Sequence, residues 1–332
     1  MEAPLVSCVV AIYNLADCVE RCVDSLLNQD YENLQIILVD DGSTDDSLAV
    51  CRKISSAHEN IKVLSKQNGG QSSARNYAVA RIEEGLVVFV DIDDVVAPDF
   101  VSTLVAANGR GQKDISVVGL YQTGNPVEWL ENYKVGARDV LTLGSDEAVR
   151  RLLAANGINE SPCGKLAPVD IWKKVPFPEG RVYEDLSVMA RVFGGAERIN
   201  VVDAKLYGQV YRKGSTTRKK INKKQFLDFA LAIRDVNDYA VARFGDSISE
   251  LMAFRALMCA RLLRLENDLS ERCSDCESIL NKAANYLREI EMTILFSRSI
   301  DFSLKAKVFL ILHFPKAYQA LYLLGERKKM KA

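Results

Sequence analysis

Apolar runs alternate with segments of helical periodicity over the first part of the chain. The β-branched run at 5–12 predicts a strand, and apolar positions within 17–29 recur at the spacing of a helix. The same succession of strand, turn and helix recurs from 34–39 onward and again within 60–85, and 86–90 supplies a further strand. Strands that alternate with helices predict an α/β fold with a doubly wound, mostly parallel central sheet flanked by helices.

The pattern loosens in the second third of the chain. In chain order it predicts a strand at 115–122, a short helix at 146–155, a Pro/Gly-rich connection at 156–185 and a helix at 185–193. Beyond residue 225 nearly every segment has helical periodicity with an apolar stripe. We therefore expect one domain over 1–220, made of halves at 1–110 and 111–220, and a helical C-terminal region over 221–332.

Polar residues follow the ends of four predicted segments. They are Tyr13 and Asn14, Asp40 to Ser43, Asn68 to Gly70, and Asp91 to Asp94. In doubly wound sheets, ligands bind beyond the carboxyl ends of the strands, where loops and helix N-termini gather. The four stretches are therefore expected to converge on one rim and to form a ligand site.

Three carboxylates come directly out of the apolar strand at 86–90. Buried carboxylates are costly unless they are paired or bound to a cation. If the strand stays extended through Asp93, then Asp91 and Asp93 face one side and Ile92 faces the other. Two such carboxylates suit a hard divalent cation that is shared with a substrate's phosphates. Acidic turn and helix-cap positions explain Asp94 and Asp99 but not the whole set.

The stretch NGGQSSARN at 68–76 has two interpretations. Its successive backbone N–H groups, with the planar guanidinium of Arg75, suit a phosphate or the edge of a nucleobase. A glycine turn before a capped helix has the same local sequence. The stretch alone leaves both open.

Composition excludes some classes of protein. The 43 Lys and Arg residues nearly balance the 44 Asp and Glu residues, so no overall field points to nucleic acid as a partner. The first residues lack the basic start and cleavage site of a secretory signal, so we expect a cytoplasmic protein. The eight cysteines have no regular spacing, which fits reduced thiols, and the single CxxC at Cys273 and Cys276 is weak evidence for zinc.

Four motifs together resemble one enzyme family. AIYN, VDDGSTDDS, NGGQSSARN and DIDD have the order and spacing of the nucleotide-sugar half of family 2 inverting glycosyltransferases with the GT-A fold. The resemblance covers residues 5–100. It continues more loosely through CGKLAP, FPEGRVYEDLSV and YRKGSTT, which resemble acceptor-side motifs of bacterial members that build capsule, exopolysaccharide or lipopolysaccharide. It implies that 1–110 binds the nucleotide sugar and that 111–220 is the acceptor side.

The resemblance also implies roles for individual residues. The loop with Tyr13 and the carboxylate of Asp40 contact the base and ribose, and Arg75 lies near the base. Asp91 and Asp93 form the metal motif for Mn²⁺ or Mg²⁺, with Asp93 the direct ligand. Ile92 replaces a small polar residue common in the family but leaves both carboxylates in place. The expected nucleotide side comprises Ala11, Tyr13, Asp40, Asp41, Asn68, Gly69, Gly70, Arg75, Asp91 and Ile92.

A second acidic motif, YEDLSV at 183–188, is the expected catalytic site. An inverting transfer needs one carboxylate to take the proton of the attacking hydroxyl. The resemblance assigns this role to Asp185 and gives Glu184 the role of orienting nearby groups. Acids also favour the first turn of a helix whatever the function, so the two residues alone leave the role open.

Two segments of the chain are rich in Lys and Arg. Within 205–224, Arg212 and Ser215 match a family segment that closes over the diphosphate, although a run of basic residues also suits a solvated face. From Arg298 to the end there are eight basic residues against Asp301 and Glu326, and charges and a proline interrupt any membrane span. This tail has two interpretations: peripheral contact with an anionic membrane leaflet, or packing against the first domain or a homodimer partner.

The resemblance predicts a metal-dependent enzyme that transfers a sugar from a nucleotide diphosphate donor, UDP-linked, to a hydroxyl of a bacterial glycan or lipid-linked acceptor. A catalytically idle subunit that only binds sugar nucleotides is the alternative. A signalling receiver domain shares ILVDD but needs only about half of this core and has no use for DIDD with YEDLSV.

Overall fold

The computed structural model describes residues 3–109, 113–211, 220–271, 273–298 and 300–329. The chain divides into two compact units. The first comprises Met1–Ala148, Ser161–Gly180 and Arg191–Arg212, and the second comprises Val149–Glu160, Arg181–Ala190 and Lys213–Ala332. Two short segments before residue 212 thus group with the C-terminal helices. The division of the chain at residue 220 into two domains stays a prediction.

The first unit contains a mixed sheet of nine strands with the order β3-β2-β1-β4-β8-β6-β9-β5, and β7 pairs with β9. The strands are β1 (Val6–Ile12), β2 (Leu34–Asp40), β3 (Ile61–Ser65), β4 (Leu86–Asp91), β5 (Val95–Val96), β6 (Asp114–Thr123), β7 (Val140–Gly144), β8 (Lys165–Pro168) and β9 (Arg198–Val210). Pairing is parallel among β1 to β4 and between β6 and β9, whereas β5, β7 and β8 run antiparallel to their neighbours. The predicted doubly wound, mostly parallel sheet is confirmed.

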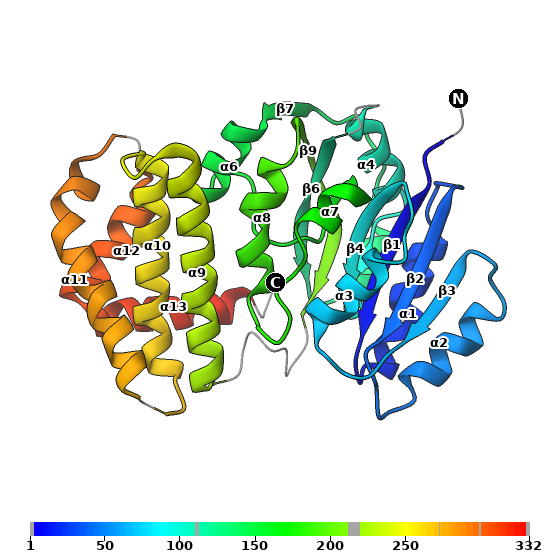
Figure 1. Ribbon diagram of the computed structural model, residues 1–332, viewed down its shortest axis with the longest axis horizontal. Coiled ribbons are helices and arrows are strands. Elements are labelled where there is room, and N and C mark those ends of the chain that lie inside the picture. The colour runs from blue at the N-terminus through cyan, green and yellow to red at the C-terminus, as the bar shows by residue number, and fades with distance from the viewer. Residues whose placement is uncertain (1–2, 110–112, 212–219, 272, 299, 330–332) are drawn as a thin grey trace. The chain divides into compact units, whose positions relative to one another are not determined.

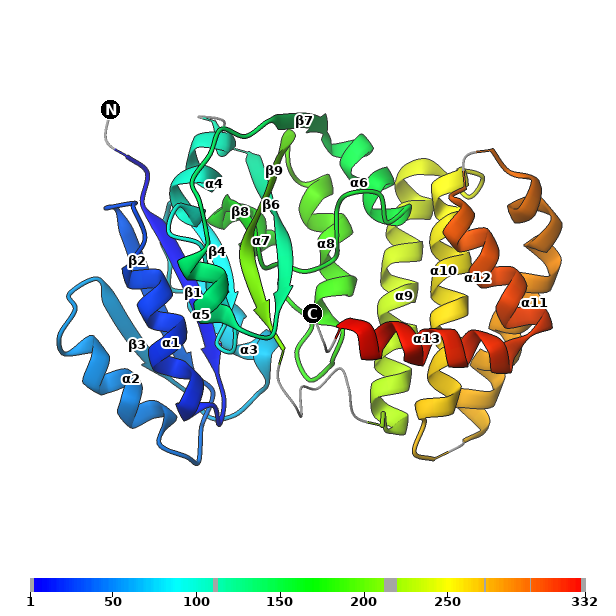
Figure 2. The same ribbon diagram turned by 180° about the vertical axis from the view of Figure 1, so that it is seen from behind.

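Helices cover both faces of this sheet. They are α1 (Ala16–Leu27), α2 (Ser47–Ser55), α3 (Gln71–Val79), α4 (Phe100–Asn108), α5 (Pro126–Glu131) and α7 (Val169–Lys174). Two further helices, α6 (Ser145–Leu153) and α8 (Glu184–Gly194), each have residues in both units. Figure 1 shows α3 and α7 in front of the sheet, and Figure 2 shows α1 and α2 in front of the opposite face. The mostly buried side chains of β1, β2 and β4 form the core between these layers. Strands that are covered on both faces carry such continuous apolar runs.

The prediction of an irregular connection at 156–185 is wrong in part. It contains the buried strand β8 and the helix α7. The six residues of α7 are too few for a helical stripe to stand out in the sequence, and all four residues of β8 are buried, so the strand shows no alternation. The 13-residue strand β9 was also missed, because its residues Arg198–Val210 mix buried, half-buried and exposed positions irregularly.

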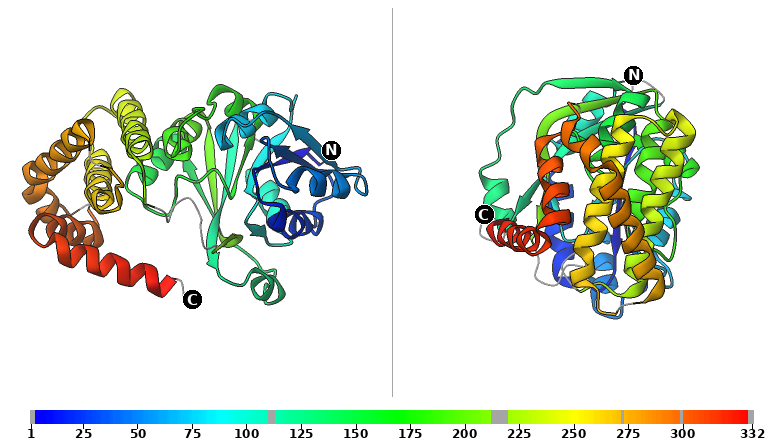
Figure 3. Two further views of the ribbon diagram at one scale, coloured as in Figure 1. Left: turned by 90° about the horizontal axis from the view of Figure 1, so that it is seen from below. Right: turned by 90° about the vertical axis from the view of Figure 1, so that its left-hand side faces the viewer.

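The second unit contains a group of long helices. They are α9 (Lys223–Phe244), α10 (Ser249–Leu265), α11 (Ser274–Phe296), α12 (Phe302–His313) and α13 (Pro315–Lys329), with a short 3₁₀ helix at Glu266–Asp268. A core of small and branched side chains, including Ala256, Leu287 and Val308, joins α10, α11 and α12. Figure 1 shows α13 running across α9, α10 and α11, and Figure 3 shows the same helix, in red, from two further sides. None of the helices in the described part of the chain combines the length and apolar character that crossing a membrane requires.

Candidate functional site

The carboxyl ends of three adjacent strands bring the first predicted site residues together. The register of β1 places Ala11 beside Asp91 of β4 and Ile12 beside Asp40 of β2. The loop after β1 therefore lies between the two acidic strand ends. The convergence that the order of elements predicted is present for these residues.

The loop after β1 is tied to the loop after β2. Asn14 has φ of 51°, a left-handed conformation that asparagine tolerates better than most residues. Its Oδ1 accepts a hydrogen bond from the N–H of Thr44 at 2.7 Å, and its own N–H donates to Ser43 Oγ at 3.1 Å. The side chain of the preceding Tyr13 is left exposed. The geometry therefore presents an aromatic ring at the rim on a fixed backbone.

Asp40 and Asp41 have different surroundings. Asp40 is buried and accepts hydrogen bonds from the N–H of Ser43 and from Ser65 Oγ, both at 3.2 Å. Asp41 is also buried but forms an ion pair with Lys66 at 2.9 Å. Thus both carboxylates of the DDGS motif already have protein partners.

The carboxylate of Asp41 holds the glycine loop. It accepts the N–H groups of Gly69 at 3.0 Å and Gly70 at 2.7 Å, and Asn68 Nδ2 donates to the Asp41 carbonyl at 2.9 Å. Gly42 has φ of 72°, and a Cβ there would lie 2.7 Å from the N atom of Asn68. Two of the N–H groups that could face a phosphate therefore bind Asp41 in this structure, and the contact of Asn68, Gly69 and Gly70 with a nucleotide stays a prediction.

Replacing Asp41 with Ala should destabilise the fold, because it removes an acceptor of buried N–H groups and leaves Lys66 without this partner. We expect a loss of about 2–4 kcal/mol in the free energy of unfolding, measured by urea denaturation. Asp46→Ala is the control, since Asp46 is exposed and its side chain makes no capping hydrogen bond. Equal stability of the two variants would contradict the role given to Asp41.

The acidic segment after β4 is a turn. The strand ends at Asp91, and the N–H of Asp94 donates to the Asp91 carbonyl at 3.0 Å. The premise that the strand stays extended through Asp93 is therefore wrong. The reason is a long-range contact, because the Asp94 carboxylate turns inward and accepts the N–H of Val210 and the hydroxyl of Tyr207, each at 2.8 Å.

Tyr207 on β9 is a residue that sequence reasoning missed. Its buried hydroxyl donates to the Asp94 carboxylate and accepts the N–H of Asp91 at 2.9 Å. Burial raises the pKa of Tyr207 well above its ordinary value, so the hydroxyl stays protonated. A single side chain thereby fixes both ends of the 91–94 turn. No local motif marks a tyrosine that lies 113 positions from its partner.

Arg75 lies against Asp91. Its guanidinium donates to Asp91 Oδ1 at 2.8 Å, and Gln71 Nε2 donates to the same oxygen at 2.9 Å. The guanidinium also packs over the rings of Phe89 and Phe177, at 5.6 and 5.3 Å. Arg75 is buried, so in this structure it positions a carboxylate, and its contact with a base stays a prediction.

The turn crowds negative charge. Burial, and then the nearby Asp91 carboxylate, raise the pKa of Asp94 from 3.8 to about 8. Asp93 is partly exposed, whereas one oxygen of Asp91 is already used by Arg75 and Gln71. Among the described residues no group of three or more acidic, histidine or cysteine side chains could hold a metal ion alone. Two carboxylate ligands completed by substrate phosphates and water fit a hard cation that keeps part of its hydration shell.

The raised pKa of Asp94 predicts a pH-dependent stability of the metal-free protein. The folded state keeps this proton up to about pH 8, whereas the unfolded state releases it near pH 4. Folding therefore takes up a proton between these values, and stability falls as the pH rises. In EDTA, the melting temperature of Asp94→Asn should fall less steeply with pH than that of the wild type. Asp24→Asn, an exposed acid, should keep the wild-type slope; parallel slopes for all three proteins would refute this.

The YEDLSV motif lies in the second unit. Glu184 and Asp185 begin α8, and Asp185 Oδ1 accepts the N–H of Leu186 at 2.7 Å. Tyr183, just before them, has φ of 62°, a strained conformation for an aromatic residue. The N–H of Val182 donates to Asp228 at 3.1 Å. Glu184 and Asp185 therefore form an acidic first turn of α8. The hydrogen bonds of this turn and of the preceding residue Val182 fix the backbone that carries Asp185.

Two of the predicted site residues cannot be placed. Arg212 and Ser215 lie outside the described residues. Their contact with a diphosphate stays a prediction.

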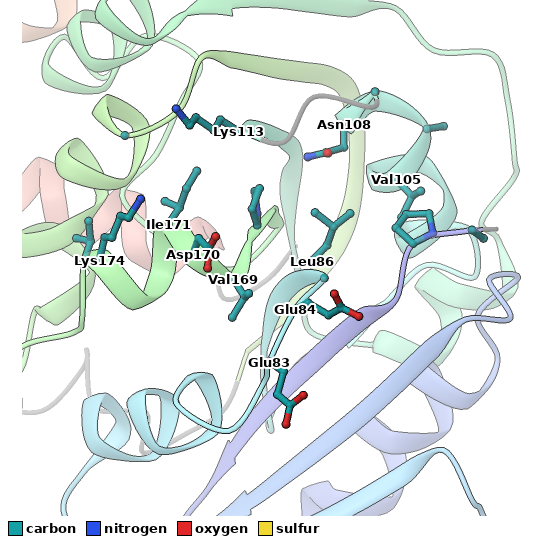
Figure 4. A pocket seen from close by; sticks show the side chains of 18 residues that line it. Glu83, Glu84, Leu86, Val105, Asn108, Lys113, Val169, Asp170, Ile171 and Lys174 are labelled. Atoms are coloured by element: carbon teal, nitrogen blue, oxygen red, sulfur yellow. The ribbon is translucent and has the colours of Figure 1, made fainter. Parts of the chain in front are cut away.

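A pocket of about 960 Å³ lies at the opposite end of the strands (Figure 4). Its lining includes Glu83, Glu84 and Leu86 before and at the start of β4, with Asp170 and Lys174 of α7. None of the predicted site residues lines it. Its lining mixes acidic and basic side chains, so neither charge dominates, and we assign the pocket no ligand.

The sequence is similar to those of known glycosyltransferases. The family model "Glycosyl transferase family 2" matches residues 7–163. Glycosyltransferase GlyG of Streptococcus pneumoniae is 31% identical over 225 residues, which cover 66% of this chain and 74% of that protein. Glycosyltransferase GlyA of the same organism is 29% identical over 220 residues, or 64% of this chain, and the match spans only 31% of its length.

Solved structures show the same fold. A crystal structure of S. aureus TarS 1–349 with UDP-GlcNAc superposes with a TM-score of 0.61 at 18% identity, covering 95% of this chain and 88% of that one. The mannosyltransferase PcManGT of Pyrobaculum calidifontis, with GDP-Man and Mn²⁺, superposes with a TM-score of 0.54 at 17% identity, covering 99% and 88%. Together with the acidic turn and its flanking loops, these matches show that the chain belongs to glycosyltransferase family 2 and has the GT-A fold.

Proposed function

We propose that the protein is an inverting glycosyltransferase that transfers a sugar from a nucleotide diphosphate donor, UDP-linked, to a hydroxyl of a bacterial glycan or lipid-linked acceptor. Three findings support this: membership of family 2, the TarS structure with UDP-GlcNAc, and similarity to the minor teichoic acid biosynthesis protein GgaB of Bacillus subtilis, 27% identical over 230 residues. The observation that carries the proposal is the acidic turn at 91–94, which lies beside the loop that follows β1, with the end of β2 on the other side of that loop.

The donor side of the proposed site uses residues of the first unit. We assign the base and ribose to the exposed Tyr13 and the region of Asp40. Asp93, with Asp91 beside it, would hold Mn²⁺ or Mg²⁺, which supplies charge neutralisation for the leaving diphosphate. Arg75 and Gln71 fix the Asp91 carboxylate at 2.8 and 2.9 Å, so it needs little reorganisation when the donor binds.

The catalytic step in this proposal is a single displacement. The acceptor oxygen forms a bond to the anomeric carbon on the face opposite the diphosphate, and the bond between that carbon and the diphosphate oxygen breaks. The Asp185 carboxylate takes the proton of the acceptor hydroxyl as it attacks. Glu184 orients groups next to it. We place the reaction in the cytoplasm, with a peripheral position at the inner face of the cell membrane when the acceptor is lipid-linked.

A donor-turnover assay tests the proposal. Purified protein is incubated with UDP-Glc, UDP-Gal, UDP-GlcNAc, UDP-GalNAc or GDP-Man, with Mn²⁺ or EDTA, and release of the nucleoside diphosphate is followed. We expect slow Mn²⁺-dependent hydrolysis of one UDP-sugar, and proton NMR should first detect the sugar with inverted anomeric configuration. Nucleotide binding without release from any donor would favour the idle sugar-nucleotide-binding subunit instead.

A further inference from the structure

Large apolar side chains protrude from the last three helices. Among the described residues, the ring of Phe296 at the end of α11 is 76% exposed, and that of Phe302 at the start of α12 is 80% exposed. Phe309, Phe314, Leu321 and Leu324 follow as further exposed side chains. Exposed apolar groups concentrated in this way mark an interaction surface, because isolated ones would be scattered over the molecule. We call these six residues the apolar face of the tail.

The face is continuous along α12. Phe302 and Phe309 lie seven positions apart, which places them on one side of the helix. The Phe309 ring lies 4.8 Å from that of His313 and 6.0 Å from that of Phe314, which directly follows α12. Val308 and Ile311 of α12 point into the core of the helical unit instead. The helix is thus already anchored by one apolar side, and the other remains on the surface.

The segment that carries most of this face is rich in basic residues. The segment from Arg298 to the end carries eight Lys and Arg residues but only Asp301 and Glu326 as acids. Asp301 caps α12, accepting the N–H of Ser303 at 3.0 Å, and the nearby Glu291 contacts His313 at 2.6 Å. Asp301 and Glu291 therefore already have protein partners, and the segment from Arg298 on carries mostly cations.

We propose that the apolar face of the tail docks the protein on an anionic lipid surface. Protruding phenylalanine and leucine side chains among lysines match a helix that lies in the plane of a membrane interface, where apolar groups enter the acyl region and cations meet phosphate headgroups. The mostly positive charge favours lipid over a second copy of this chain, because two copies would bring like charges together. The inference extends the proposed function, since it gives the enzyme a route to a lipid-linked acceptor.

Vesicle co-sedimentation of the full chain tests this inference without needing activity. We expect binding to vesicles of phosphatidylcholine with 30% phosphatidylglycerol, weaker binding in 0.5 M NaCl, and little binding to phosphatidylcholine alone. The double variant Phe302→Ser, Phe309→Ser should bind about tenfold or more weakly, as should Lys305→Glu, Lys307→Glu. The control Val127→Ser, Val135→Ser, exposed apolar residues of the first unit, should bind like the wild type.

Three results would overturn the inference. They are absence of wild-type binding to the anionic vesicles, equal binding by the Phe302→Ser, Phe309→Ser variant, and a dimer in light scattering that the same two substitutions dissociate, which would assign the face to a second copy. Circular dichroism and thermal melting show whether each variant is folded. Nucleotide binding should be unchanged in the tail variants, so failure on vesicles and failure of the proposed function are separate outcomes.

Discussion

Replacing Asp185 with Asn is expected to lower turnover by about 10²- to 10⁴-fold, the contribution that a positioned general base makes. The amide has the shape of the carboxylate but cannot take a proton from the attacking hydroxyl. Its oxygen can still accept the N–H of Leu186, as Asp185 does at 2.7 Å, so α8 should begin unchanged. The dissociation constant for the donor, measured by calorimetry, should stay within about twofold of the wild type.

A matched substitution separates catalysis from helix capping. Asp170 is also an acid in the first turn of a helix, α7, and it is exposed. Asp170→Asn should therefore keep full turnover and a similar melting temperature. If Asp185→Asn behaves like this control, then the acidic first turn of α8 is only a structural feature and another base must be sought.

The second large effect is expected at Asp93. The Asp93→Ala substitution removes the partly exposed carboxylate of the 91–94 turn while leaving Asp91 paired with Arg75. In calorimetry, the affinity for UDP in the presence of Mn²⁺ should fall at least about 100-fold, since losing even the groups that support a metal ligand costs 10- to 100-fold. In EDTA the wild type and the variant should bind UDP equally weakly.

The control for this variant is Asp30→Ala, which removes an exposed acid elsewhere in the first unit. It should retain the Mn²⁺ dependence of the wild type. Undiminished Mn²⁺-dependent affinity in Asp93→Ala would mean that Asp93 is not a ligand and that the turn serves only to shape the end of β4.

The first half of the sheet could be predicted because its signals are local. Buried parallel strands such as 34–40 read as continuous apolar runs, and the helices between them have a clear period. Elements that lack such local signals could not be predicted. Strand β8 has only 4 residues, and its pairing with β4 and β6 depends on residues far away in the chain. No window of sequence contains that information.

For the candidate site, too, the sequence predicts the residues but not their contacts. The acidic and glycine motifs could be found from residue types that follow strand ends. Their contacts could not, because they depend on partners distant in sequence: Asp41 binds the N–H groups of Gly69 and Gly70, and Tyr207 binds the carboxylate of Asp94. These contacts change the interpretation of the motifs, since the glycine loop is held by a carboxylate and the acidic segment is a turn.

We propose that the rim formed by the 91–94 turn and the loops after β1 and β2 binds a nucleotide through a divalent cation. A thermal-shift panel of UDP, GDP, ADP, CDP and dTDP, each with Mn²⁺ or with EDTA, tests it most directly. A ligand that binds only the folded state raises the melting temperature. We expect a rise with UDP that requires Mn²⁺; no shift with any nucleotide, or the same shift in EDTA, would mean that the rim does not bind a nucleotide through a cation.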